Sequence, residues 1–235
     1  MNNSIDIILP VYNEEDNIEK ITSDIIELLH KKKIANYNII IAEDGSTDST
    51  KKILFSIGKN KKIKVISFKE RLGYTKSILN AIQLSKSKFL IFLDSDGQHE
   101  ISDIIKFIKL ANNNLVIGYR KKRGDSIGRL ILHKLARNFI SIFLKLRMRD
   151  ASSGFILVDR KLMNKISKYI GYTESCFWWE FSIVVSKMRI NFIEREILHH
   201  KRTLGSGFFK LKDLFRLFFR EFGGLVKLIF YLRKK

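Results

Sequence analysis

Residues 89–99 read FLIFLDSDGQH, and this stretch sets the fold class and the position of the site. Five apolar residues, 89–93, are followed directly by two aspartates, Asp94 and Asp96. A short apolar run that a polar turn closes is typical of a buried β-strand. The stretch therefore predicts a buried strand that carries two carboxylates at its carboxyl end.

The same rhythm extends outward on both sides of this strand. Further strands are predicted at 5–9, 37–42, 63–68 and 115–118, separated by helical patterns at 14–33, 48–58, 73–86 and 101–112. Alternating strands and helices favour an α/β fold with a mostly parallel, twisted sheet and helices on both faces. Ligands of such sheets bind at the carboxyl ends of the strands.

Polar clusters follow four of the predicted strands. They read PVYNEE, EDGSTDST, DSDGQH and GYRKKRG in chain order. We expect these clusters to meet at one rim of the sheet, because the carboxyl ends of parallel strands lie at the same edge.

The second half of the chain is less regular. Its pattern predicts a long basic helix at 126–148, a strand at 153–158, helices at 161–170 and 178–189, and a strand at 191–198. Residues 208–232 are predicted to form an amphipathic helix or a helix pair.

The acidic cluster suits a hard cation. Asp94, Asp96 and Gln98 supply oxygen ligands close together after a buried strand, and Mg²⁺ and Mn²⁺ prefer such ligands. The alternative is that Asp96 caps a helix that begins near residue 100, which explains one aspartate but not both. We therefore favour a Mg²⁺ or Mn²⁺ site and assign His99 a structural role.

Bulk composition bounds the remaining possibilities. The 235 residues fit one large or two small domains, and 44 Lys and Arg against 24 Asp and Glu give a net charge of +20. A basic chain favours an anionic partner, although a composition rich in Lys, Asn and Ile explains part of the excess. A single cysteine and a start without signal-peptide features predict a cytoplasmic protein.

The order of the motifs PVYNE, EDGSTDST, DSDGQH, GYR and SSGF resembles the family 2 glycosyltransferases of GT-A fold. The chain is most similar to their dolichol-phosphate mannosyltransferase and polyprenyl-phosphate sugar transferase group. The resemblance covers about residues 4–205 and implies a GT-A catalytic domain at 1–205. It implies an inverting, metal-dependent hexosyl transfer from a nucleotide sugar, a UDP- or GDP-sugar, to a polyprenyl phosphate.

The resemblance also implies which residues hold the nucleotide. These are Pro10, Tyr12, Glu14, Glu43 and Asp44, with Glu43 at a position where the family usually has aspartate.

The resemblance implies that the catalytic residues are Asp94, Asp96 and Arg120. Asp96 and Gln98 would contact the metal, and Asp94 would contact the metal or the sugar nucleotide. Arg120 would contact phosphate, to which a guanidinium fork is suited.

The acceptor phosphate would be held by Arg120 together with Arg129, His133 and Lys134, where relatives keep Arg, Ser and Arg. A solvated basic helix face is the alternative for each of the last three residues.

Two later segments complete the implied site. Asp150 and Ser153, in DASSGF, would shape the site near the sugar. His199, Lys201 and Arg202 would form a basic lid over the diphosphate, and the alternative is a surface loop before the last helix.

The acceptor decides whether a base is needed. A lipid phosphate is already anionic at neutral pH, because its second pKa is about 6. A glycan hydroxyl, as in cell-surface polysaccharide or lipopolysaccharide synthesis, is the alternative acceptor and requires a carboxylate base. Glu180 is then a candidate base, or a structural partner of the late basic loop.

Residues 206–235 form a segment of their own in this interpretation. Lys212, Arg216, Arg220 and Lys227 recur on one helical face, and the apolar runs are too short to span a bilayer. We expect this segment to lie on an anionic membrane surface, so that the protein is peripheral on the cytosolic face. A helix packed on the catalytic domain or at a dimer interface is the alternative.

Two other functional classes are disfavoured. No nucleic-acid partner is expected, because the chain lacks helix-turn-helix, zinc or RNP-like patterns and its rim is acidic. The intact set of Asp94, Asp96 and Gln98 argues against a catalytically dead scaffold, and the sequence leaves the oligomeric state open.

Overall fold

The computed structural model describes residues 3–121, 127–143, 145–200 and 211–234. Within the helices that begin at residues 127 and 211, the side chains of 127–130, 132–133, 136, 143 and 211–219 lie outside the described part.

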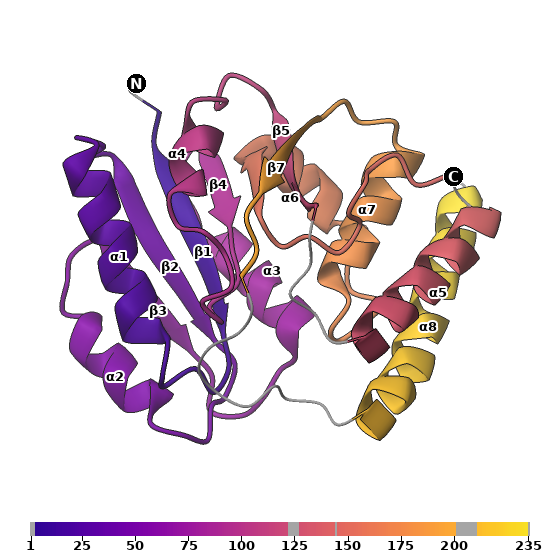
Figure 1. Cartoon of the computed structure of the whole chain (residues 1–235), viewed down its shortest axis with the longest axis horizontal. Coiled ribbons are helices and arrows are strands. Elements are labelled where there is room, and N and C mark those ends of the chain that lie inside the picture. The colour runs from indigo at the N-terminus through magenta and orange to yellow at the C-terminus, as the bar shows by residue number, and fades with distance from the viewer. Residues whose placement is uncertain (1–2, 122–126, 144, 201–210, 235) are drawn as a thin grey trace.

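The core of the fold is a seven-stranded mixed sheet (Figure 1). Its strands are β1 (Ile5–Val11), β2 (Tyr37–Glu43), β3 (Ile63–Ser67), β4 (Phe89–Phe92), β5 (Leu115–Arg120), β6 (Ile156–Asp159) and β7 (Ile193–Ile197), in the order β3-β2-β1-β4-β6-β5-β7. β6 is antiparallel to both neighbours, and every other pairing is parallel. The predicted mostly parallel α/β sheet is confirmed.

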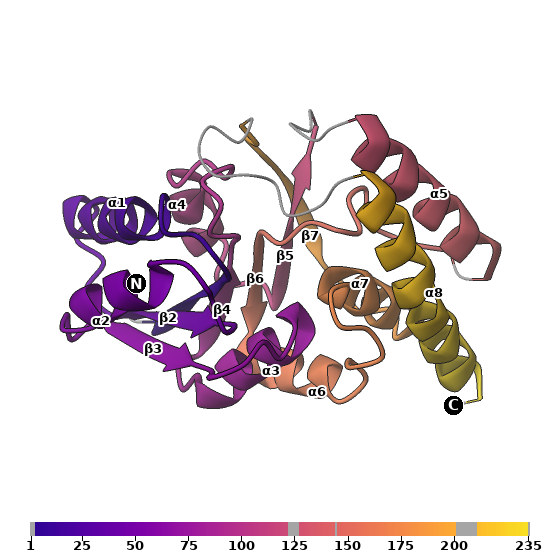
Figure 2. The same ribbon diagram turned by 90° about the horizontal axis from the view of Figure 1, so that it is seen from below.

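Helices cover both faces of the sheet. They are α1 (Ile18–Lys31), α2 (Thr50–Ile57), α3 (Tyr74–Leu84), α4 (Asp103–Ile108), α5 (Ile127–Phe143), α6 (Arg160–Ser167), α7 (Phe177–Lys187) and α8 (Leu211–Arg233). One core cluster joins the sheet to α1, α2 and α4, and the other joins it to α3, α5, α6, α7 and α8. Alternate residues of β1 divide between them, Ile7 in one and Ile8 in the other, as the strand period of two requires. Figure 2 shows α1 and α4 on one side of the strands and α3 and α6 on the other.

The single antiparallel strand, β6, has a consequence for the site. Because β6 runs against β4 and β5, its amino end lies at the rim where those two strands end. Residues 150–155, which precede β6, therefore reach the same rim as the loops after β1, β2, β4 and β5. The strand begins at Ile156, three residues later than predicted, and the preceding Gly154 lies against Asp94 instead.

The last helix, α8, packs beside α5 and α7 at the end of the molecule furthest from α1 and α2 (Figures 1 and 2). Leu225, Leu228, Ile229 and Leu232 belong to the hydrophobic core. Gly224 permits a close approach, because a Cβ there would lie 2.2 Å from the Tyr172 carbonyl oxygen. The described part of α8 therefore packs on the catalytic domain, which is the alternative given above for residues 206–235. Among the described residues, no helix combines the length and the apolar content that crossing a bilayer requires.

Candidate active site

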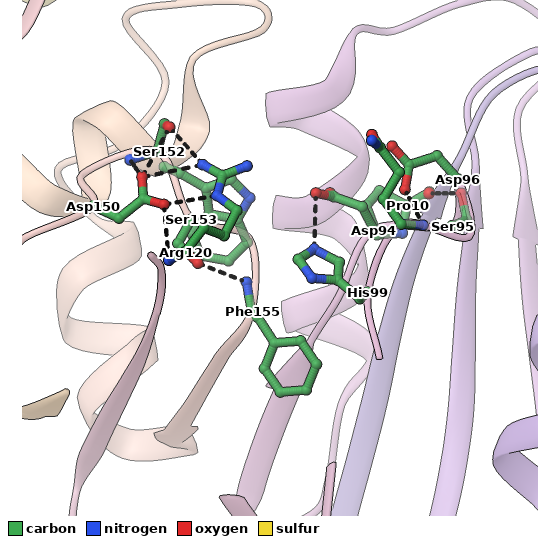
Figure 3. Close-up of polar contacts among 12 residues, drawn as sticks. Pro10, Asp94, Ser95, Asp96, His99, Arg120, Asp150, Ser152, Ser153 and Phe155 are labelled. Atoms are coloured by element: carbon green, nitrogen blue, oxygen red, sulfur yellow. Dashed lines mark hydrogen bonds and ion pairs between the residues drawn. The ribbon is translucent and has the colours of Figure 1, made fainter. Parts of the chain in front are cut away.

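The rim gathers two groups of polar side chains that face each other (Figure 3). One group comes from the loop after β4 and contains Asp94, Asp96 and His99. The other comes from the end of β5 and the segment before β6 and contains Arg120 and Asp150. The prediction that these strand ends meet at one edge of the sheet is confirmed by the parallel pairing of β1, β2 and β4 and by the orientation of β5.

Asp94 accepts a contact on each carboxylate oxygen. The Tyr74 hydroxyl lies 3.0 Å from Oδ1, and Nε2 of His99 lies 3.4 Å from Oδ2. Its side chain keeps 32% of its surface exposed, so the carboxylate is held in place and still presents a face to solvent.

The surroundings of Asp94 keep it ionised. Burial acts to raise the pKa of Asp94, but the hydrogen bond and the charge of His99 and the hydrogen bond from Tyr74 lower it. The charge of Arg120 lowers it further, and the pKa lies below its ordinary value. By contrast, burial and the charge of Asp94 raise the pKa of Tyr74 well above its ordinary value, so the phenol keeps its proton at neutral pH.

Asp96 and Gln98 are oriented by their own loop and its neighbours. The Gln98 backbone N–H donates to Asp96 Oδ1 at 3.1 Å, and the Gln98 side-chain amide donates to the His200 carbonyl at 3.0 Å. Ser95, between the two aspartates, donates to the Pro10 carbonyl at 2.7 Å. The loop after β4 is therefore attached both to β1 and to the segment after β7.

The donor chemistry fits a divalent cation that arrives with a phosphate ligand. Within the part of the chain that the structure describes, no three His, Cys, Asp or Glu side chains form a complete metal cage. Mg²⁺ rarely needs one, because it binds through one or two carboxylates and completes its shell with water and substrate phosphates. Asp94 and Asp96 at the rim match this requirement, and Gln98 adds an amide.

His99 links the acidic loop to the predicted lid. Its backbone pairs with His199 in an antiparallel bridge, and the two imidazole rings lie 5.3 Å apart. His199 thus lies beside the acidic loop, and its role in a lid over the diphosphate stays a prediction. Lys201 and Arg202, the other two predicted lid residues, lie outside the described residues.

Arg120 forms a buried ion pair with Asp150. Nε of Arg120 lies 2.7 Å from Oδ2 of Asp150, and Nη2 lies 3.1 Å from Oδ1 and 2.9 Å from the Ser152 hydroxyl. The two side chains are 8% and 6% exposed. This pair places a fixed positive charge opposite Asp94 and shows that Asp150, singled out for the sugar site, orients the arginine (Figure 3).

Glu43 and Asp44, at the end of β2, are both buried and hydrogen-bonded. Glu43 is fully buried and accepts hydrogen bonds from the Ser46 backbone and from the Ser67 hydroxyl. Asp44 accepts from the backbone N–H groups of Leu72 at 2.7 Å and Gly73 at 3.1 Å. Both carboxylates therefore shape the loops around the predicted nucleotide position, whose direct contacts stay a prediction.

The other predicted nucleotide residues border the same loops. Tyr12 carries the Arg71 guanidinium over its ring, 4.0 Å from the centroid, and Arg71 Nε lies 3.7 Å from Asp44 Oδ2. Glu14 is buried and accepts a hydrogen bond from the Asn17 side chain at 2.7 Å. Arg71 is a basic residue at the rim that the sequence analysis did not single out.

The predicted acceptor residues lie on α5. Lys134 is exposed, and the side chains of Arg129 and His133 lie outside the described part. Their roles stay predictions.

Glu180 has a structural role instead of that of a base. Its carboxylate is fully buried and accepts hydrogen bonds from the backbone N–H groups of Gly171, Tyr172 and Thr173, and from the Thr173 hydroxyl. Burial raises its pKa despite these bonds. The described contacts fasten the 171–173 loop and not the late basic loop.

Two further site residues escaped the sequence analysis, Tyr74 and Trp178. The Trp178 indole donates to the Tyr74 oxygen at 2.8 Å, across 104 positions of sequence. The double tryptophan of residues 177–181, FWWEF, was a visible signal, since buried tryptophan requires a hydrogen-bond acceptor.

The chain matches the family model described as glycosyl transferase family 2 over residues 6–169. It is 29% identical over 185 residues to CsbB of Bacillus subtilis, whose name describes a glycosyltransferase. That match covers 74% of this chain and 55% of CsbB, so the chain spans about half the length of this relative. It is also 26% identical over 250 residues to a dolichyl-phosphate beta-glucosyltransferase of Dictyostelium discoideum, covering 95% of this chain and 76% of that protein.

Solved structures show the same fold at low identity. The glucosyl-3-phosphoglycerate synthase of Mycobacterium tuberculosis, crystallised with Mn²⁺, UDP and phosphoglyceric acid, superposes with a TM-score of 0.72. The sequences are 17% identical, and the match covers 97% of this chain and 79% of that one.

Proposed function

Because the chain belongs to glycosyl transferase family 2, we propose that this glycosyltransferase moves a sugar from a nucleotide sugar to a polyprenyl phosphate at a membrane surface, with a divalent cation. The observation that carries the proposal is that an acidic group of side chains and a group that contains an arginine lie on opposite sides of one rim. Asp94 and Asp96 lie on one side, and the buried pair of Arg120 and Asp150 lies on the other.

The acidic side suits the donor. Asp96 and Asp94 would hold the cation with Gln98, and when bound the cation would neutralise the diphosphate that leaves in the reaction. Asp94 and Asp96 are anchored through Tyr74 and through their own loop, so they are preorganised for this task.

The opposite side suits an anionic acceptor. Two carboxylates that could serve as bases, Asp150 and Glu180, are both occupied, one by Arg120 and the other by four hydrogen bonds. An acceptor phosphate needs no base, because it is already ionised at neutral pH. The positive charge of Arg120 would orient such a phosphate through the field it adds to the rim. The dolichyl-phosphate beta-glucosyltransferase relatives of Dictyostelium discoideum and of Saccharomyces cerevisiae support this acceptor class.

The nucleotide is proposed to lie along the loops after β1 and β2. Arg71 contacts both Tyr12 and the buried Asp44 there, so an aromatic ring, a guanidinium and a carboxylate lie next to one another. A ring and a guanidinium can stack on a base, and the carboxylate can accept from base or ribose donors.

The proposed membrane surface is the outer side of α5 and α8. Ile131, Leu135 and Ile142 of α5 and Phe230 and Tyr231 of α8 are exposed apolar residues on these adjacent helices. Apolar side chains can enter the headgroup boundary while basic residues contact anionic lipid. We therefore propose a peripheral position on the cytosolic face of a membrane.

A thermal-shift screen tests the donor part of the proposal. UDP- and GDP-sugars would be added to the full chain with and without Mn²⁺, because a ligand that binds only the native state raises the melting temperature. We expect one donor to stabilise the protein only when metal is present. Stabilisation by none of them, with or without metal, would contradict the proposal.

Product analysis then tests the acceptor. With the selected donor, we expect a sugar-phosphate-polyprenol product from added polyprenyl phosphate, measured by mass spectrometry. Transfer to a glycan hydroxyl with none to the lipid would instead identify the alternative acceptor class.

A further inference from the structure

We propose that Tyr74 is a positioning residue that fixes the Asp94 carboxylate in the donor site, and that Trp178 in turn fixes Tyr74. The inference rests on the proposed function and adds to it a residue of α3 and one of α7. Both contacts join segments that are distant in sequence, at 20 and 104 positions, so they are features of the tertiary structure.

The direction of both hydrogen bonds follows from the chemistry of the groups. An indole N–H is a donor only, so the contact of 2.8 Å uses a lone pair of the Tyr74 oxygen. An ionised carboxylate is an acceptor only, so the single Tyr74 proton is directed at Asp94 Oδ1 across 3.0 Å. The result is a directed series from Trp178 through Tyr74 to Asp94, in which each bond polarises the next.

The space around Asp94 makes this orientation specific. A Cβ at Gly154 would lie 3.0 Å from Oδ2 of Asp94, 3.1 Å from Oδ1 and 3.0 Å from Nε1 of Trp178. The backbone before β6 thus passes directly beside the carboxylate and the indole. Gly154 lies on one side of the carboxylate and His99 lies near Oδ2. The hydrogen bond from the Tyr74 hydroxyl to Oδ1 then restricts rotation of the Asp94 carboxylate.

The start of α3 is itself held in place. Gly73 precedes the helix at φ +94°, and its backbone N–H donates to Asp44. The next residue after Tyr74, Thr75, donates its N–H to the Glu174 carbonyl at 2.9 Å. Glu221 of α8 accepts from the Glu174 backbone at 2.8 Å, so the segment that holds α3 is tied to α8. Tyr74 therefore has a rigid base from which to position Asp94.

The first test compares two tyrosine-to-phenylalanine variants of the full chain. Tyr74→Phe removes the proton given to Asp94 and keeps the ring. Tyr37→Phe is the matched control, because Tyr37 begins β2 at the end of the sheet opposite the rim and the substitution removes the same hydroxyl from a tyrosine that is packed in the fold. We expect Tyr74→Phe to weaken Mn²⁺-dependent binding of the donor by about 10- to 100-fold, the loss typical when a residue that orients a metal ligand is replaced, and Tyr37→Phe to leave binding unchanged.

The second test separates positioning from general structural support. Binding of Mn²⁺ with the donor is measured by calorimetry for Asp94→Ala, Tyr74→Phe and the double variant. Alanine is used at position 94 because the amide oxygen of an asparagine would still accept from the Tyr74 hydroxyl. If Tyr74 acts through Asp94, the tyrosine substitution has no further effect once Asp94 is replaced. An equal loss in both backgrounds, or wild-type binding by Tyr74→Phe, would overturn the inference.

A crystal structure of Tyr74→Phe keeps this test separate from the proposed function. We expect Asp94 to adopt a different rotamer in that variant, whether or not a sugar nucleotide binds the wild type. Failure of every nucleotide to bind the wild type would reject the proposed function alone. An unchanged Asp94 rotamer would reject the positioning role alone.

Discussion

Arg120 and Asp150 meet in a two-point ion pair, Nε to Oδ2 at 2.7 Å and Nη2 to Oδ1 at 3.1 Å, at the point where β5 and the segment before β6 converge. Both side chains are almost wholly buried. The pair explains how an arginine can present its charge to the rim in one fixed orientation, because a guanidinium fork bound at two points cannot rotate.

This geometry predicts that Asp150→Ala lowers the free energy of unfolding by about 3–5 kcal/mol, since it leaves the Arg120 charge buried without its partner. Urea unfolding followed by circular dichroism measures the loss. The matched control is Asp24→Ala, which breaks the exposed pair with Lys20 and should cost at most about 0.5 kcal/mol. Similar losses in the two variants would show that the Arg120–Asp150 pair is not the stabilising contact described above.

Asp96→Ala is expected to abolish sugar transfer while the protein stays folded. Removing a group that stabilises developing charge slows a reaction by about 100-fold or more. Transfer would be measured with the donor selected by the thermal-shift screen, and folding by the melting temperature without ligand.

Asp24→Ala is the control for this variant too, because Asp24 lies on α1, where it pairs with Lys20, and outside the loops proposed to hold the donor. It should retain full transfer. Metal-dependent turnover retained by Asp96→Ala would show that the cation is held elsewhere.

Asp6 predicts a specific dependence of stability on pH. It lies buried in β1 and accepts hydrogen bonds from Ser85, Ser87 and Asn38. Burial acts to raise its pKa, but these hydrogen bonds outweigh burial and hold the pKa below its ordinary value. A folded-state pKa below the unfolded value of about 3.9 means that ionised Asp6 stabilises the fold above about pH 4. This contribution disappears as the pH falls through the folded-state pKa.

The measurement is urea unfolding of wild type and Asp6→Asn from pH 7 to pH 3. Asp6→Asn should be less stable at pH 7, because its amide NH₂ meets hydroxyl and N–H donors. We expect the difference between the two proteins to narrow as the pH falls below about 4, because unfolded wild type then binds a proton at Asp6 before the folded protein does. A difference that is constant over the whole range would assign the acid sensitivity to other carboxylates.

The sequence predicted the elements of this fold better than the contacts between them. The run 89–93 followed by Asp94 and Asp96 correctly placed a buried strand with carboxylates at its end, because apolar runs and polar turns are local signals. The convergence at one rim followed from the rule for parallel sheets.

Long-range contacts could not be read in the same way. The partners of Arg120 and Tyr74 are 30 and 20 residues away, and nothing in the local pattern distinguishes Asp150 or Asp94 from other aspartates as their acceptors. Likewise, the antiparallel direction of β6 has no local signature in four residues, ILVD. The amphipathic pattern of residues 208–232 fits a helix on a membrane surface and a helix packed on a protein core equally well. The packing of Leu225 and Leu228 shows that one face of this helix is buried in the hydrophobic core.

That packing changes how membrane binding should be tested. Removing residues 206–235 would also remove Leu228 and Ile229 from the core, so a loss of vesicle binding could follow from unfolding. Substitutions on the exposed face of α5 avoid this problem. Ile131 and Leu135 are 52% and 51% exposed and lie four residues apart, on the same side of the helix.

We expect the double variant Ile131→Asp/Leu135→Asp to bind vesicles that contain anionic lipid about tenfold or more weakly than wild type. Two partly buried aliphatic side chains supply more than the 1.4 kcal/mol or so that a factor of ten requires, and the added aspartates are repelled by anionic lipid. Phe55→Asp is the control, because Phe55 on α2 is 79% exposed at the opposite end of the molecule (Figure 1). Vesicle binding of the three proteins is measured by flotation. Equal melting temperatures show that all three are folded. Equal flotation of wild type and the double variant would mean that this face of α5 does not enter the bilayer, and an equal loss in Phe55→Asp would mean that added negative charge alone weakens binding.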